Sequence, residues 1–133
     1  MSKKLRTAII GCGGIANGKH MPAIKSTGVA DIVAFCDIIE ERAVDAKNRY
    51  GTPDSKVYTD YKELLKDESI DVVHVCTPNS SHAPISIDAL NAGKHVLCEK
   101  PMAKTAAEAV AMVEAARKNN RKLSIGYQNR FRP

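Results

Sequence analysis

The feature that most constrains the fold is an alternation, along the whole chain, of short apolar runs with longer segments of helical period. The apolar runs predict strands at residues 7–10, 32–36, 72–76, 95–98 and 123–126, with a short one near 56–58. Helices are expected between them, at 14–27, 39–50, 60–66, 82–92 and 105–119. This rhythm is typical of βαβ units and a parallel sheet, and strands this apolar indicate burial on both faces. The predicted fold class is α/β, a doubly wound, mainly parallel six-stranded sheet (Rossmann fold) of order 3-2-1-4-5-6.

Two of the predicted helices have recognisable capping residues at their ends. Gly93 follows Asn91 and Ala92, where a helix needs a residue in the left-handed conformation. Thr105, with Glu108 three residues later, predicts a capping box at the start of the last helix.

Length and composition indicate one folded domain. The 133 residues, 44% apolar and 26% charged, are close to the globular average, so we expect a single domain over 1–133 with no second domain. No run approaches the length of a membrane span, and no signal peptide is recognisable, which predicts a cytoplasmic protein without a membrane partner. The four cysteines form no C-x-x-C pair, so neither a zinc site nor a disulfide is expected.

The net charge of +5 raises the question of nucleic-acid binding. The positive charge gathers at the two ends of the chain, whereas residues 11–114 hold 11 basic and 15 acidic side chains. With only two phenylalanines and four tyrosines available for stacking, no nucleic-acid partner is expected.

A phosphate-binding turn is predicted directly after the first strand. Gly11 and Gly13 have G-x-G spacing, and Ala16 takes the third position of G-x-G-x-x-G/A. The first glycine allows a tight turn, the second lets the backbone approach a pyrophosphate, and the third residue lets helix and strand pack closely. The helix beginning near Gly14 then directs free N–H groups at the phosphates.

An acidic residue follows the second strand at the place where such folds bind an adenosine ribose. Asp37 lies 21 residues after Ala16, and its carboxylate would accept ribose hydroxyls and repel a 2′-phosphate. This favours NAD over NADP, although Arg42 keeps the NADP alternative open. Asp37 is also placed where it could cap the helix that starts at Ile39, and both roles could hold, although ribose binding is the favoured one.

Two further strand ends carry candidate residues. After the strand at 72–76 comes a polar loop, in which Asn79 is a candidate for cofactor contact or for helix capping. His82 is a candidate for cofactor contact or for a place on the first turn of the helix that follows. After the strand at 95–98, Lys100 stands between Glu99 and Pro101 at the edge where ligands bind in open α/β sheets. Its ammonium could donate a proton to a substrate oxygen while Glu99 orients it, which makes Lys100 a catalytic candidate.

These residues together resemble the N-terminal half of the Gfo/Idh/MocA oxidoreductase family. The motifs that carry the resemblance are the stretch Ala8–Ala16, Asp37, Cys76–Asn79 with His82, Gly93–Val96 leading to Glu99–Pro101, and Gly126–Phe131.

The resemblance implies an NAD cofactor and a role for each motif. Contact with the pyrophosphate is implied for Gly11, Gly13, Gly14 and Ile15, contact with the ribose for Asp37, and contact with the middle and nicotinamide side for Thr77, Pro78, Asn79 and His82. Glu99, Lys100 and Gln128 would lie on the nicotinamide side, with Lys100 assisting proton and hydride transfer to a sugar, polyol or related carbonyl.

The family's second domain, which handles the substrate, has no counterpart in the sequence. We therefore expect the chain to bind NAD(H) and to be inactive without that domain. The alternative function is a non-catalytic nucleotide-binding or regulatory module. The apolar surface and strand edge around 123–127 that the second domain would cover predict a homodimer.

Overall fold

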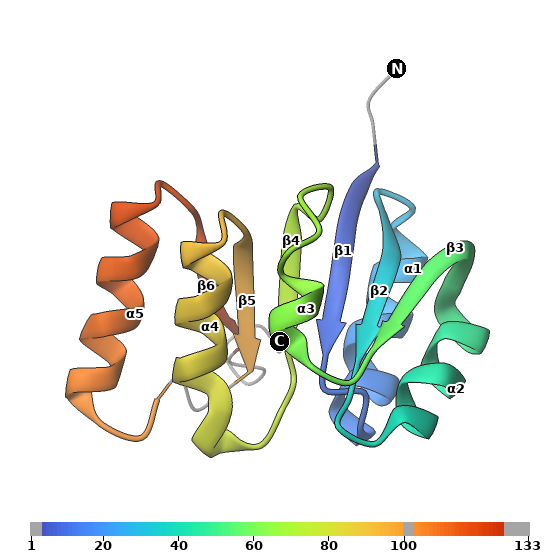
Figure 1. Ribbon diagram of the computed structural model, residues 1–133, viewed down its shortest axis with the longest axis horizontal. Coiled ribbons are helices and arrows are strands. Elements are labelled where there is room, and N and C mark those ends of the chain that lie inside the picture. Colours follow the sequence, from blue (N-terminus) through green and yellow to red (C-terminus); the bar gives the residue numbers. More distant parts are fainter. Residues whose placement is uncertain (1–3, 100–102, 127–133) are drawn as a thin grey trace, which may run out of the picture.

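The computed structural model describes residues 4–99 and 103–126, which form one six-stranded sheet (Figure 1). Every pair of neighbouring strands runs parallel, and the order is β3-β2-β1-β4-β5-β6. The strands are β1 (Leu5–Ile10), β2 (Ala30–Cys36), β3 (Gly51–Tyr58), β4 (Val72–Val75), β5 (His95–Glu99) and β6 (Leu123–Gly126). The predicted α/β class and strand order are confirmed.

β3 is longer than its sequence suggests. A strand was expected only near 56–58, because Pro53 and Asp54 are poor strand residues. The structure extends it back to Gly51, with a shift of register against β2. The Ser55 hydroxyl holds this irregular half by donating to the Ile32 carbonyl at 2.8 Å. β3 is an edge strand, where such residues are tolerated.

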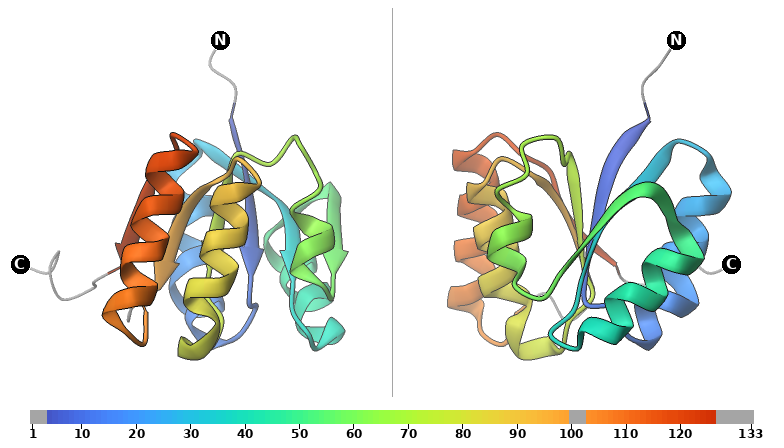
Figure 2. Two further views of the ribbon diagram at one scale, coloured as in Figure 1. Left: turned by 60° about the vertical axis from the view of Figure 1, so that its left-hand side comes forward. Right: turned by 45° about the vertical axis from the view of Figure 1, so that its right-hand side comes forward.

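Helices cover both faces of the sheet, in two groups (Figures 1 and 2). On one face, α1 (Met21–Thr27) and α2 (Glu40–Tyr50) lie over β1, β2 and β3. On the other face lie α3 (Tyr61–Leu64), α4 (His82–Asn91) and α5 (Ala106–Lys118). The helix expected at 14–27 contains a wide π-helical turn, η1 (Ala16–His20), and that expected at 60–66 is shorter because the chain turns at Leu65.

Each face has its own hydrophobic core. One core joins α3, α4 and α5 to the sheet, and Val73, Val75 and Leu90 are fully buried in it. The other joins η1, α1 and α2 to β1 and β2 around Phe35 and Met21. Both predicted helix caps form: Thr105 Oγ1 accepts the N–H of Glu108 at 3.1 Å, and Gly93 has a φ of +86°. The second bond of the capping box differs, because the Glu108 carboxylate accepts the N–H of Lys104 rather than that of Thr105.

The face of β4 and β5 beside α1 is not covered by a helix of the described part of the chain. A groove of about 390 Å³ follows the strands there, lined by Leu5, Val29, Val72 and Leu97 among others. Beyond it, β6 pairs only with β5 within the described residues.

All four cysteines are buried and free. Across residues 4–99 and 103–126, each helix is too short or too polar to cross a membrane. The same residues contain no group of three or more His, Cys, Asp or Glu side chains placed to hold a metal ion.

Candidate functional site

The turn after β1 is fixed by a close approach of three strand ends. Gly11 donates its N–H to the Cys36 carbonyl at 2.8 Å, and Cys76 donates to Ile10 at the same distance. Gly11 has a φ of +93°, and a Cβ on it would lie 2.8 Å from the carbonyl carbon of Cys76. Both the backbone conformation and the neighbouring strand therefore require glycine here.

The next two glycines face open space. A Cβ on Gly13 or on Gly14 would meet no atom within 4 Å. Ala16, at the third position of the motif, is fully buried against the sheet. The loop therefore has the form that a pyrophosphate requires, with close packing behind and free room in front.

Asp37 is buried at the end of β2, where two backbone amides hold its carboxylate. Oδ2 accepts the N–H of Cys12 and Oδ1 accepts the N–H of Ile39, both at 2.9 Å. α2 begins only at Glu40, and its N-cap residue, Ile39, makes no side-chain capping bond. Asp37 is therefore not the N-cap of α2. It joins the glycine loop to the turn after β2, and each oxygen keeps capacity for a further donor.

The loop after β4 is closed by its own hydrogen bonds. Ser81 donates its hydroxyl to Thr77 Oγ1 at 2.7 Å and its N–H to the Pro78 carbonyl at 3.0 Å. His82, the first residue of α4, is buried, with Nε2 2.8 Å from the Thr77 carbonyl oxygen. The imidazole therefore supports the loop from behind. Asn79 begins the turn η2 (Asn79–Ser81), and its side chain lies outside the description.

These loops surround one hollow of about 700 Å³ at the carboxyl edge of the sheet. This volume is in the range of small-molecule and cofactor sites. The residues that line it come from the glycine loop, the end of β2 and the loop after β4, and include Gly11, Gly13, Asp37, Ile38, Arg42, Thr77, Pro78 and Ser81. Residues far apart in the sequence thus line one hollow, because the carboxyl ends of parallel strands lie at the same edge of the sheet.

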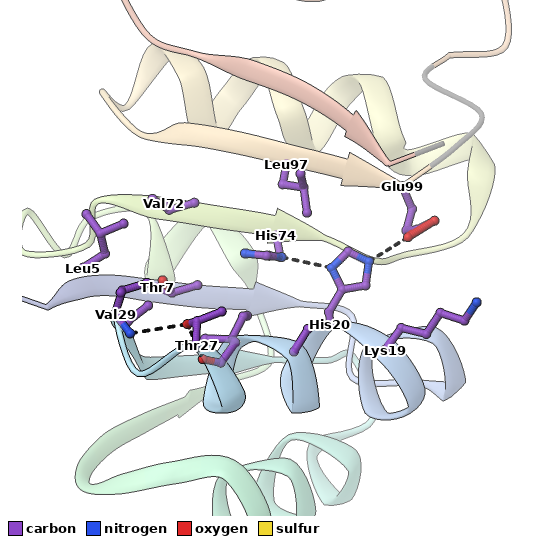
Figure 3. Close-up of a pocket in the computed structure, with 13 residues that line it drawn as sticks. Leu5, Thr7, Lys19, His20, Thr27, Val29, Val72, His74, Leu97 and Glu99 are labelled. Atoms are coloured by element: carbon purple, nitrogen blue, oxygen red, sulfur yellow. Dashed lines mark hydrogen bonds and ion pairs between the residues drawn. The ribbon is translucent and has the colours of Figure 1, made fainter. Parts of the chain in front are cut away.

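Glu99 lies elsewhere, at the end of the groove beside α1. Figure 3 shows His20 between His74 on β4 and Glu99 on β5. His20 Nε2 is 2.7 Å from Glu99 Oε1, and its Nδ1 is 2.9 Å from His74 Nδ1. Burial, together with the neighbouring His20, lowers the pKa of His74 to about 4, so this ring stays neutral at physiological pH. Lys100, Pro101 and Gln128 lie outside the described residues.

Two features of this edge were missed by sequence reasoning. His20 was not singled out, because its partners lie on β4 and β5 and no motif near His20 in the sequence indicates them. Asn17 was not singled out either, although a polar amide in the first turn of a helix after a glycine loop is a usable signal.

The cysteines near the site are kept in the thiol form. Burial, followed by the nearby Asp37 carboxylate, raises the pKa of both the Cys12 and the Cys36 thiol to about 12. Burial also raises the pKa of Cys76. Because the thiolate is the nucleophilic form, these side chains act as small apolar residues.

Comparison with known proteins identifies a family model over residues 5–127, the Gfo/Idh/MocA model described as an oxidoreductase family with an NAD-binding Rossmann fold. The chain is 36% identical over 128 residues to inositol 2-dehydrogenase of Salmonella typhimurium, covering 96% of the chain and 38% of that protein. It is 37% identical over 130 residues to D-glucoside 3-dehydrogenase of Escherichia coli, covering 98% and 36%. The chain thus spans less than half of the length of these relatives.

Solved structures agree with this assignment. The WlbA dehydrogenase of Chromobacterium violaceum, in complex with NADH and UDP-GlcNAcA, superposes with a TM-score of 0.90 at 34% identity, covering 98% of this chain and 37% of that one. The 3-ketoreductase KijD10 of Actinomadura kijaniata, in complex with NADP, has a TM-score of 0.91 at 28% identity, covering 98% and 41%. Similar domains are therefore found with either dinucleotide.

Proposed function

Because the chain belongs to the Gfo/Idh/MocA oxidoreductase family and forms its NAD-binding Rossmann domain, we propose that it is the cofactor-binding half of an NAD-dependent sugar or polyol dehydrogenase. The observation that carries this proposal is the 700 Å³ hollow that joins the glycine loop, Asp37 and the Thr77 loop. When bound, the dinucleotide accepts or supplies a hydride at its nicotinamide ring.

The chain's own residues bind and orient the cofactor. The open space in front of Gly13 and Gly14 fits a pyrophosphate. Asp37 accepts the ribose hydroxyls with the oxygen capacity that Cys12 and Ile39 leave free. Thr77 and Pro78 form the wall toward the nicotinamide, and His82 keeps that wall in place. Gly11 and Ile15 shape the turn behind the phosphates.

The cofactor preference gives the direct test of this proposal. We expect NAD and NADH to bind and NADP to bind at least about tenfold more weakly, a difference of about 1.4 kcal/mol, because Asp37 would repel a 2′-phosphate. Asp37→Ser should reduce the difference in affinity between NAD and NADP. The control Asp54→Ser, which removes an acidic side chain on β3 outside the hollow, should leave that difference unchanged. Calorimetric titration measures both. Equal dissociation constants for the two cofactors in the unmodified chain would contradict the assignment.

Catalysis itself is proposed to need residues that hold the substrate as well as the cofactor. Lys100 would supply the proton-handling amine next to Glu99, and Asn79 and Gln128 would contact the nicotinamide side. Orientation of a bound acceptor is worth up to about 7–11 kcal/mol, so a chain that binds only the cofactor should not turn over. An assay of the 133 residues with NAD and a panel of polyols is expected to show no oxidation. Steady turnover would contradict this part of the proposal.

We also propose that the chain is cytoplasmic and self-associates as a homodimer. Within residues 4–99 and 103–126, the uncovered groove on the face of β4 and β5 is apolar over much of its length, and β6 has a free strand edge. Exposed apolar faces and strand edges favour pairing, and a two-fold dimer is the commonest closed solution. Sedimentation equilibrium decides the point: a single 14.4 kDa species up to high micromolar concentration would contradict the dimer.

A further inference from the structure

Asn17 makes an unusual set of hydrogen bonds within the glycine loop. Its side-chain Nδ2 donates to two main-chain carbonyls of the loop, that of Cys12 at 2.8 Å and that of Gly13 at 3.0 Å. Its own N–H also donates to the Gly13 carbonyl, at 3.0 Å. One residue thus draws two successive loop carbonyls toward the helix that follows.

The direction of these carbonyls fixes the direction of the amides next to them. In a planar trans peptide, the C=O of one residue and the N–H of the next point to opposite sides. A Cys12 carbonyl turned toward Asn17 therefore turns the Gly13 N–H away from it. The Gly13 carbonyl does the same for the Gly14 N–H. Both amides are directed to the side away from Asn17, at the two positions where a Cβ would meet open space.

The local backbone is built to place this side chain. Asn17 lies in the π-helical turn Ala16–His20, in which the N–H of Met21 bonds the carbonyl of Ala16. The wider turn changes the direction in which its side chains project, and such turns occur often at functional sites. From α2, the Tyr50 hydroxyl donates to the Asn17 carbonyl at 3.4 Å and supports the turn.

The side chain also carries a cost that a purely structural residue would avoid. Asn17 Oδ1 is buried, and no group among the described residues donates to it. An unpaired buried acceptor destabilises the folded state, and an apolar side chain of similar size would not have one. The amide is therefore best explained by what its Nδ2 does to the loop.

We propose that Asn17 is a positioning residue that sets the pyrophosphate selectivity of the site by turning the Gly13 and Gly14 amides outward. The inference rests on the proposed NAD-binding function and deepens it. A diphosphate group, rather than the adenosine half of the cofactor, is the chemistry that depends on this side chain. Asp37 would hold the adenosine ribose through carboxylate oxygens that Asn17 does not contact.

The test compares ligands that share the adenosine but differ in the diphosphate. Dissociation constants are measured for NADH, ADP-ribose and adenosine, with the unmodified chain and with Asn17→Leu, which keeps the size of the side chain and removes both donors. We expect the affinity for NADH and ADP-ribose to fall at least tenfold, while that for adenosine changes less than about twofold. A general loosening of the structure would weaken all three ligands together.

Two further variants keep the result decisive. Asn17→Ala removes the same donors without filling the space, and should give the same pattern if the leucine chain does not fold. Tyr50→Phe removes the bond to the Asn17 carbonyl but leaves both loop carbonyls held, so the ratio between ADP-ribose and adenosine should not change. Equal losses of affinity for all three ligands, or no loss of affinity, would overturn the inference about Asn17. The proposed function would still stand in that case, provided that the unmodified chain binds NADH. Failure of the unmodified chain to bind NADH would overturn both.

Discussion

Replacing glycines by alanine one at a time separates two reasons for glycine in this chain. Gly11 has a positive φ of +93°, and an added Cβ would lie 2.8 to 2.9 Å from backbone atoms of Cys76 and Thr77. Gly28, which ends α1, has a positive φ of +70° but nothing within 4 Å of the added Cβ. Gly13 has neither a positive φ nor a close neighbour. Alanine would therefore meet both backbone strain and a close contact at Gly11, backbone strain alone at Gly28, and neither at Gly13.

The expected losses of unfolding free energy follow from these differences. Alanine in the left-handed conformation costs about 1–2 kcal/mol, which is the whole effect expected for Gly28→Ala. At Gly11 the added carbon also meets main-chain atoms that cannot rotate away, and forcing a methyl into filled space adds about 1–3 kcal/mol. Gly11→Ala should therefore cost about 2–5 kcal/mol, a large share of the stability of an ordinary domain. Gly13→Ala should be neutral or stabilising by up to about 1 kcal/mol.

Urea denaturation at constant pH measures the three values, and titration with NADH gives the second readout. We expect Gly13→Ala to weaken NADH binding at least about tenfold while leaving the unfolding midpoint almost unchanged, since its Cβ would fill the space in front of the loop. Gly28→Ala should lower the unfolding midpoint and leave NADH binding almost unchanged. If Gly11→Ala cost no more than Gly28→Ala, the close approach of the β4 end would not be what requires glycine in this turn.

Two further predictions concern stability. Because the pKa of His74 falls from its ordinary 6.5 to about 4 on folding, the unfolded chain binds more protons between these values. The contribution of His74 is thus fully present above pH 6.5 and is lost as pH falls toward 4. Urea titrations at several pH values should show this slope, and His74→Gln should flatten it; an unchanged slope would contradict the assignment. Thr105→Ala should cost about 0.5–2 kcal/mol by removing the bond to the Glu108 N–H, while Thr105→Ser should cost little. Equal losses in thermal unfolding would show that the hydroxyl does not cap α5.

The topology and the glycine turn could be predicted because their signals are local. Apolar runs at strand spacing and the G-x-G step after β1 each lie within a few residues, and the strand order follows from right-handed connections. The start of β3 could not be predicted in this way. Pro53 and Asp54 argue against a strand, and only the long-range bond from Ser55 to Ile32 explains why one forms there.

The sequence predicted which strand ends carry the candidate residues, but not how their side chains are oriented. Asp37 was expected to bind a ribose or to cap α2. The structure shows that its two oxygens accept the amides of Cys12 and Ile39 and that it does not cap α2, while its contact with a ribose stays a prediction. His82 was expected near the cofactor, and this contact stays a prediction; the structure shows its buried ring against the Thr77 carbonyl. In both cases the sequence places the residue at the correct strand end. Which way a side chain turns there depends on partners brought close by the fold.

The two buried carboxylates at the sheet edge differ in the kind of donor that holds them. Asp37 accepts two backbone amides, which do not titrate. Glu99 faces the His20 imidazole, and His20 in turn contacts His74. Donors of fixed charge suit the role proposed for Asp37, which is to distinguish a ribose hydroxyl from a phosphate. The wide turn that carries both Asn17 and His20 links the two carboxylates, since Asn17 bonds the Cys12 carbonyl and His20 lies against Glu99.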